Sequence, residues 1–285
     1  MVDKLVVNNH KMIGRYAPSP TGDLHLGNLR TAILAWLQVR SQGGTFLLRM
    51  EDLDTPRVVK GSDEQILEDL EWLGIDWDGE IVYQSQRTEL YQQALADLSE
   101  QGLIYPCYCS RKDIQQAVSA PHQSSGVYPG YCQNLTKDQQ LEKAIKKEPA
   151  LRCKVDGDLV DSCGDFVVKR ADGLFAYQLA VVVDDLDQGI TNVLRGEDLA
   201  DSTQRQKYLA RRLSPSSAEI KYVHVPLMLD EYGKRMSKRD GSLSVSEYRS
   251  KGVSAEQIIG KLAYSLSIIN NNEPLSLLDL LNINS

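Results

Sequence analysis

The chain contains 285 residues, of which 42% are hydrophobic and 25% are charged, ordinary proportions for a globular protein that can bury a substantial core. Its formal net charge of −7 excludes a uniformly basic nucleic-acid-binding surface but leaves room for local basic patches, which decide such binding. No apolar run approaches the ~20 residues of a membrane span and no signal peptide begins the chain, so we expect a cytoplasmic protein without a membrane partner.

The first predicted unit is a strand, a stiff loop and a helix. Residues 12–17 can form a short strand, and apolar residues at helical spacing then predict a helix that ends near Gly43: Leu29, Ala32, Ile33, Trp36 and Leu37. The loop between them holds prolines, which stiffen it, and glycines, which let a ligand approach the backbone: Pro18, Pro20, Gly22 and Gly27. A helix N-terminus after such a loop favours an anion, because unpaired N–H groups and the helix dipole both attract negative charge. The sequence therefore predicts a phosphate site here, to which His25 could donate a hydrogen bond.

The following segment continues an α/β pattern. Residues 45–50 (TFLLRM) are typical of a buried strand, and Glu51 comes directly after it, at the sheet edge where open α/β sheets bind ligands. Apolar periodicity predicts helices around residues 66–73 and 90–98. Strands that alternate with helices in this way predict parallel βαβ units.

The composition changes near residue 105, and residues 105–164 are less apolar and richer in loop residues. The α/β pattern then resumes with predicted strands at 165–170, 175–183 and 193–194 and a predicted helix at 201–213. A capping box of Ser254 with Gln257 starts the last predicted helix. We therefore predict two halves of one α/β domain (1–104 and 165–230), an insertion between them (105–164), and a basic loop with C-terminal helices (231–285).

The insertion contains a candidate metal site. Cys107 and Cys109, with Cys132 across a Pro-Gly loop, would supply three of the four ligands that tetrahedral zinc requires. Tyr128 or His122 must supply the fourth; histidine is the ordinary choice, because a phenol must lose a proton of pKa ~10. The alternative is that the three cysteines are simply buried, reduced thiols. The total of five cysteines is odd, which fits free thiols or a metal better than a disulfide framework.

A second candidate phosphate site is the basic loop 233–239 (GKRMSKR), which includes Lys238. A glycine beside several cations suits a loop that covers a polyphosphate, although a basic loop is more often an ordinary solvated surface. Other basic clusters lie at 146–147 and 205–212.

These two phosphate sites resemble the two signatures of the class I aminoacyl-tRNA synthetases. Residues 25–28 (HLGN) resemble the HIGH motif, their lead-in 15–22 (RYAPSPTG) resembles the glutamyl branch, and 235–238 (RMSK) resemble KMSKS, in the correct order along the chain. The resemblance implies a Rossmann-like catalytic domain with a parallel sheet, and ATP as a substrate with Mg²⁺. It further implies that His25, Asn28 and Lys238 are catalytic and that His25, Gly27 and Lys238 bind ATP. Asn28 departs from the family, which has histidine at this position.

The resemblance also implies a glutamate site built from Arg15, Ala17, Ser19, Glu51, Tyr177 and Arg195. The chemistry is coherent, because a guanidinium matches a side-chain carboxylate and Glu51 can hold an α-ammonium group. An arginine at 195 would prefer glutamate to glutamine, whose neutral amide would leave the guanidinium uncompensated. The structural alternative for Arg195 is an ion pair with Glu197 or Asp198. In the zinc site, small paralogues of the glutamyl enzymes share the Cys-x-Cys…Tyr-x3-Cys arrangement, which favours Tyr128 over His122.

The glutamyl-tRNA synthetases continue with a helical anticodon-binding domain for which this sequence has no counterpart, so it resembles their small paralogues. That resemblance implies activation of L-glutamate by ATP and transfer of the glutamyl group to queuosine, the modified wobble base in the anticodon arm of tRNA(Asp). Two rival hypotheses are a truncated glutamyl-tRNA synthetase that charges the 3′ end of tRNA(Glu), and a non-catalytic RNA-binding module.

Overall fold

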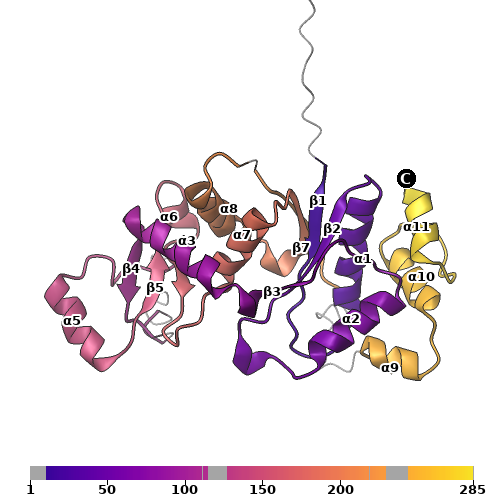
Figure 1. Cartoon of the computed structure of the whole chain (residues 1–285), viewed down its shortest axis with the longest axis horizontal. Coiled ribbons are helices and arrows are strands. Elements are labelled where there is room, and N and C mark those ends of the chain that lie inside the picture. Colours follow the sequence, from indigo (N-terminus) through magenta and orange to yellow (C-terminus); the bar gives the residue numbers. More distant parts are fainter. Residues whose placement is uncertain (1–10, 111, 115–126, 218, 229–242, 285) are drawn as a thin grey trace, which may run out of the picture.

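The computed structural model describes residues 11–284 except 111, 115–126, 218 and 229–242. In Figure 1 the main sheet, which includes β1 and β7, lies between two peripheral regions: the C-terminal helices α9 to α11 on one side, and a small sheet with helix α5 on the other. The helices are α1 (Leu26–Arg40), α2 (Ser62–Trp72), α3 (Thr88–Glu100), α5 (Lys137–Lys146), α6 (Leu159–Ser162), α7 (Tyr177–Asp187), α8 (Ser202–Leu213), α9 (Val245–Ser250), α10 (Ala255–Ser265) and α11 (Leu277–Asn284), with short 3-10 turns at Thr55–Arg57, Gln84–Gln86 and Glu197–Leu199.

The main sheet is parallel and has the strand order β3-β2-β1-β7-β8. Its strands are β1 (Ile13–Tyr16), β2 (Thr45–Met50), β3 (Val82–Tyr83), β7 (Asn192–Gly196) and β8 (Lys221–Val225). Strand β1 pairs with β2 on one side and with β7, far along the chain, on the other. The carboxyl end of β1 is therefore the point where the strand order reverses, and ligands of open α/β sheets bind at such a point.

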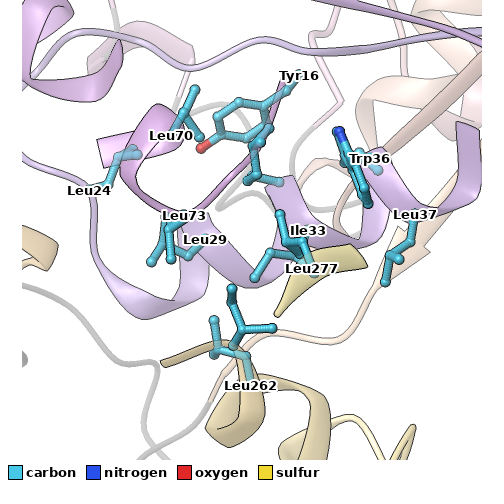
Figure 2. Close-up of a cluster of buried hydrophobic side chains, with 14 of the residues drawn as sticks. Tyr16, Leu24, Leu29, Ile33, Trp36, Leu37, Leu70, Leu73, Leu262 and Leu277 are labelled. Atoms are coloured by element: carbon cyan, nitrogen blue, oxygen red, sulfur yellow. The ribbon is translucent and has the colours of Figure 1, made fainter. Parts of the chain in front are cut away.

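Helix α1 packs close to β1 because Gly14 has no side chain: a Cβ there would lie 2.5 Å from Cγ2 of Val39. The buried face of α1 is surrounded by side chains from α2, α10 and α11, as Figure 2 shows for Leu29, Ile33, Leu37, Leu70, Leu73, Leu262 and Leu277. Leu29 is fully buried, so its replacement by alanine is expected to cost about 2–5 kcal/mol. This cluster fixes the N-terminus of α1 against the sheet.

A second apolar cluster joins α3, α7 and α8 to the small antiparallel sheet, whose order is β4-β5-β6. The strands of this sheet are β4 (Ile104–Cys107), β5 (Ala150–Cys153) and β6 (Phe166–Lys169). Strand β4 begins at the predicted start of the insertion, and β6, which follows its predicted end, pairs with β5. The boundaries of the four predicted parts stay predictions.

The parallel α/β fold predicted from the sequence is confirmed, but one predicted strand is wrong. Residues 175–183 were expected to be extended, whereas helix α7 begins at Tyr177. The apolar run that suggested a strand is buried on every side of the helix, with Leu179, Ala180, Val181 and Val182 at most 1% exposed. A helix buried all round has no polar face, so its sequence shows no helical periodicity.

Other predicted elements agree with the structure. Strand β2 covers the predicted range 45–50, and β1 and β6 lie within the predicted ranges 12–17 and 165–170. Strand β7 extends beyond the predicted 193–194 at both ends, and α8 covers 202–213 of the predicted 201–213. The predicted capping box is present, because Ser254 accepts from the backbone of Gln257 and the Gln257 side chain accepts in return. Several elements were not predicted individually: strands β3, β4, β5 and β8 and helices α5 and α6. Helices α9 and α11 fall in the region where C-terminal helices were expected, but their bounds were not predicted. Among the described residues, no helix combines the length and apolar character needed to cross a bilayer.

Candidate active site and metal centre

A cavity of about 730 Å³ opens at the carboxyl ends of β1, β2 and β7. It brings together all the site residues predicted in the described part of the main domain: Arg15, Ala17, Ser19, His25, Gly27, Asn28, Glu51, Tyr177 and Arg195. The predicted catalytic residue Lys238 and the rest of its basic loop 233–239 lie outside the described residues. The loops after β1 and β2 are tied together, since the backbone N–H of Glu51 donates to the carbonyl of Pro18 at 2.9 Å.

His25 is the N-cap of α1. Its Nδ1 accepts from the backbone N–H groups of Gly27 at 3.1 Å and of Asn28 at 3.3 Å, and Oδ1 of Asn28 accepts from the backbone of His25 at 3.3 Å. Because Nδ1 is an acceptor, a neutral ring carries its proton on Nε2 and can donate from there. Gly27 leaves room for the ring: a Cβ there would lie 3.0 Å from Cε1 of His25. Asn28, the departure from the family motif, is thus part of the cap.

Arg195, on β7, is 4% exposed and is held by neutral groups. Its Nη1 donates to Gln206 at 2.6 Å and its Nη2 to Thr203 at 2.9 Å. Its Nε donates to His224 at 3.3 Å, and Tyr177, the first residue of α7, lies 3.5 Å from Nη1. The expected alternative, an ion pair with Glu197 or Asp198, is not among its contacts with the described residues.

Arg15 is held by charge instead. Its Nε and Nη2 donate to the two carboxylate oxygens of Asp185 at 3.1 and 3.4 Å. Arg49, which is fully buried, donates to Asp185 at 2.8 Å and to Glu51 at 3.4 Å. Although burial opposes it, Arg15 and Arg49 hold the pKa of Asp185 below its ordinary value. This network links the predicted glutamate residues Arg15 and Glu51 through two side chains that the sequence analysis missed.

The sequence did contain a signal for the missed residues. Arg49 interrupts the apolar strand TFLLRM, and Asp184 and Asp185 interrupt the apolar run of α7. Charges within buried segments are nearly always paired, so opposite charges in two such segments predict an ion pair. No comparable signal marked Gln206, Thr203 or His224, which look like ordinary polar positions.

Burial raises the pKa of Glu51, and the nearby guanidinium groups of Arg49 and Arg15 offset only part of that effect. The side chain is 10% exposed and faces the cavity. Burial, together with the carboxylate of Glu51, also raises the pKa of Tyr177. Glu51, Arg15 and Arg195 therefore bring one carboxylate and two guanidinium groups to a largely buried part of the cavity, where charge pairs are strong.

The candidate metal centre lies at the end of β4. The sulfurs of Cys107, Cys109 and Cys132 all lie within 4.8 Å of one another, with Cys109 and Cys132 at 3.6 Å. The hydroxyl of Tyr128 lies 3.4 Å from the sulfurs of both Cys107 and Cys109. A tetrahedral site with zinc–sulfur bonds of about 2.3 Å has ligand–ligand edges of roughly 3.5–3.8 Å, close to these three separations. His122, the other candidate ligand, lies outside the described residues.

The surroundings of the cluster shift the pKa values of Cys107, Cys109 and Tyr128 in different directions. Burial raises the pKa of Cys109 to about 11, and burial with the neighbouring thiols raises that of Tyr128. Burial also acts to raise the pKa of Cys107, but hydrogen bonds from Tyr128 and Arg152 outweigh it and leave the pKa lowered. A divalent cation bound here would lower the pKa of the thiols and of the phenol, because it stabilises their deprotonated forms. The guanidinium of Arg152 lies 3.8 Å from the centre of the Tyr128 ring, where it would also stabilise a phenolate.

Known proteins of similar sequence and structure include tRNA synthetases. A family model described as "tRNA synthetases class I (E and Q), catalytic domain" matches residues 11–269. A protein from Nocardia farcinica named glutamyl-Q tRNA(Asp) synthetase is 49% identical over 268 residues, which cover 90% of this chain and 85% of the relative. One of the same name from Symbiobacterium thermophilum is 46% identical over 290 residues, which cover 92% and 89%.

Among solved structures, the glutamate-tRNA synthetase of Elizabethkingia anophelis matches with a TM-score of 0.76 and 26% identity. The match covers 95% of this chain and 65% of that enzyme, so the chain spans slightly less than two thirds of its length.

Proposed function

The chain belongs to the family of class I tRNA synthetases for glutamate and glutamine, and on that premise we propose that it is a ligase that activates L-glutamate with ATP and transfers the glutamyl group to queuosine in tRNA(Asp). One observation carries the proposal: a single cavity holds Arg195, Glu51 and the N-terminus of α1 capped by His25. The names of the two relatives support the choice of acceptor.

In the first step, Arg195 and the hydroxyl of Tyr177 bind the side-chain carboxylate of glutamate, and Glu51 binds its α-ammonium group. An oxygen of the α-carboxylate attacks the α-phosphorus of ATP, the bond to the β-phosphate breaks, and pyrophosphate leaves. The Nε2–H of His25 and the N-terminus of α1 stabilise the phosphate charge, as Lys238 would from its loop. Mg²⁺ supplies charge neutralisation on the phosphates when it is bound.

In the second step, a hydroxyl of the queuosine cyclopentene ring attacks the acyl carbon of glutamyl-adenylate. The bond from that carbon to AMP breaks, and the hydroxyl proton leaves to solvent or to the AMP phosphate. The anticodon arm would reach the cavity with basic side chains positioning its phosphates. Of the basic clusters, Lys207 and Arg212 already pair with Glu219 and Asp156, and residues 234–239 lie outside the described part of the chain.

We further propose that Cys107, Cys109, Tyr128 and Cys132 hold one structural Zn²⁺ per chain. The close approach of four potential ligands supports this, and so does Arg152, which favours a phenolate at Tyr128. A closed set of four protein ligands is typical of structural rather than catalytic zinc. The cytoplasmic location expected from the sequence stays a prediction.

The test of the proposed function is to locate the glutamate after reaction. Purified protein is incubated with labelled glutamate, ATP and one of three RNAs: tRNA(Asp) that carries queuosine, tRNA(Asp) with guanosine at the wobble position, or a tRNA(Glu) transcript. We expect label only on the first, in the anticodon fragment after nuclease digestion. Label on the 3′ end of tRNA(Glu) would favour a truncated glutamyl-tRNA synthetase, and no glutamate-dependent ATP–pyrophosphate exchange at all would favour a non-catalytic RNA-binding module.

A further inference from the structure

Arg15 and Arg195, two of the arginines that line the cavity, differ in how their charge is compensated. Arg15 faces the carboxylate of Asp185 through two of its nitrogens. Arg195 is equally buried, yet among the described residues its hydrogen-bond partners are an amide, two hydroxyl groups and an imidazole, and its guanidinium carbon lies 4.9 Å from the centre of the Tyr222 ring. A buried guanidinium without a counter-charge is costly, so its persistence needs a reason.

The hydrogen bonds around Gln206 show which of its atoms faces Arg195. The Nε2 of Gln206 donates to Oε1 of Gln178 at 3.1 Å, and Nε2 of Gln178 donates to Oγ of Ser202 at 2.9 Å. Because a guanidinium can only donate, Gln206 directs its oxygen at Arg195, 2.6 Å away, which leaves its nitrogen for Gln178. Gln206 is 1% exposed, so its side chain is held in place, and its amide accepts from Arg195 without carrying a charge.

The other partners are neutral as well. Oγ1 of Thr203 accepts from Arg195 and lies 3.2 Å from Nε2 of His224, to which its own proton can be donated. Nε2 of His224 therefore accepts, and the ring carries its proton on Nδ1. Burial, together with the charge of Arg195, lowers the pKa of His224, which keeps the ring uncharged.

These contacts leave few donors for a ligand. A guanidinium has five N–H groups. Within the described structure, Nε and one N–H each of Nη1 and Nη2 are used by His224, Gln206 and Thr203, and the second N–H of Nη1 faces Tyr177. One N–H of Nη2 and the hydroxyl proton of Tyr177 remain to donate into the cavity. Two donors match the two oxygens of a carboxylate.

We propose that Gln206, assisted by Thr203, determines the specificity for glutamate over glutamine: it orients Arg195 without neutralising it, so the positive charge of Arg195 stays available for the substrate's side chain. This rests on the proposed activation of glutamate and names a residue outside the predicted glutamate set. A carboxylate at position 206 would pair with Arg195 and remove the attraction for glutamate, whereas the neutral amide of glutamine would not be repelled.

A purely structural role for Gln206 gives the opposite expectation. If it only held Arg195 in place, Gln206→Glu would be the milder change, because a carboxylate accepts a stronger hydrogen bond from a guanidinium. Gln206→Met, which has a similar shape but no acceptor, would be the more damaging one. Which of the two variants is more damaging therefore distinguishes an effect of the charge at position 206 from an effect on the position of Arg195. Gln178 can accommodate the carboxylate by turning its amide, since Ser202 can donate as well as accept.

The experiment measures ATP–pyrophosphate exchange with glutamate and with glutamine, in the presence of tRNA(Asp), for the wild type and both variants. We expect Gln206→Glu to lower kcat/KM for glutamate by about a hundredfold and to shrink the glutamate-to-glutamine ratio by at least about tenfold, the scale of losing one buried charge interaction. Gln206→Met should lower both rates while keeping the ratio within about threefold.

Two outcomes would overturn the inference: Gln206→Glu retains the wild-type ratio, or Gln206→Met loses it more severely. If Gln206→Glu does not give a cooperative thermal transition, Thr203→Asp replaces it, because it puts a carboxylate beside Nη2 from a less buried position, and an unchanged ratio there counts against the inference. Failure of the proposed function is distinguishable, since it would appear as absent glutamate-dependent exchange in the wild type itself.

Discussion

Asp185 and Arg15 are 170 positions apart in sequence, yet their side chains meet through two contacts of 3.1 and 3.4 Å, with 2% and 4% of each side chain exposed. The pair joins β1, from the first half of the α/β domain, to α7, from the second. It therefore fixes the predicted glutamate residues of one half relative to those of the other.

Asp185→Asn is expected to destabilise the fold by about 3–5 kcal/mol, because it leaves Arg15 and Arg49 with less compensation for their buried charge. The measurement is the free energy of unfolding in urea. The matched control is Asp187→Asn, two residues along the same helix: its carboxylate is 50% exposed and pairs with Arg87, so its loss should cost no more than about 1 kcal/mol. Equal effects from the two changes would contradict the structural role given to Asp185.

As pH falls, binding of the substrate glutamate should weaken at a higher pH than the ordinary pKa of a glutamate side chain would predict. Glu51 must be ionised to hold the α-ammonium group, and its pKa is raised above the ordinary 4.5. As pH falls, the protonated fraction therefore grows early, and kcat/KM for glutamate should fall with a midpoint above 4.5. The same shift means that ionisation of Glu51 lowers stability as pH rises through the folded-state pKa.

A pH profile of kcat/KM in the exchange assay tests this, with His224→Asn as the control because His224 also titrates near the site. The pKa of His224 is lowered from 6.5, so its protonation should destabilise the fold only as pH falls below that value. If kcat/KM of His224→Asn no longer fell at acidic pH, the fall in the wild type would be due to protonation of His224 and not of Glu51.

Lys238→Ala should slow adenylate formation far more than it weakens glutamate binding, since a charge on the phosphates matters most as they rearrange. The readout is single-turnover adenylate formation alongside glutamate affinity, with Lys251→Ala, which changes an exposed lysine after α9, as the control. If Lys238→Ala formed adenylate at the wild-type rate, the assignment of the basic loop 233–239 as the second phosphate site would be wrong.

Elemental analysis should find one Zn²⁺ per chain in gently purified protein, and Cys107→Ser should lose it together with much of the thermal stability of the insertion. Cys153→Ser, a buried cysteine outside the cluster, should retain the metal. Tyr128→Phe tests the fourth ligand: zinc that survives this change but not His122→Ala would move that ligand to His122.

A stem-loop of the tRNA(Asp) anticodon arm that carries queuosine should be a substrate by itself, because the accepting hydroxyl lies within it. Its binding should weaken steeply with added salt, as phosphate-dominated association does. The same stem-loop with guanosine at the wobble position should bind comparably but accept no glutamate. Acylation of that unmodified stem-loop would falsify the proposed acceptor.

The sequence was sufficient for the parallel sheet, most of its strands and nine of the residues that line the cavity, because short motifs mark strand ends and helix starts locally. It failed for α7, where burial on all sides removes the periodicity that distinguishes a helix. It also could not find Gln206, whose importance comes from a contact with a strand that only the tertiary fold brings near. Arg49 and Asp185 lie between these cases, since each was visible as a misplaced charge but their pairing was not.

His25 shows how closely folding and chemistry are tied in this protein. A neutral imidazole is an acceptor on one edge and a donor on the other, and the cap of α1 occupies the acceptor edge. A protonated ring would lose the cap, and an alanine would lose both edges, so neither the cap of α1 nor the phosphate binding proposed for His25 can be altered alone by such a change. Only a side chain with an acceptor and a donor pointing in opposite directions satisfies both demands. The range of substitutions open to evolution at this position is therefore narrower than either demand would impose separately.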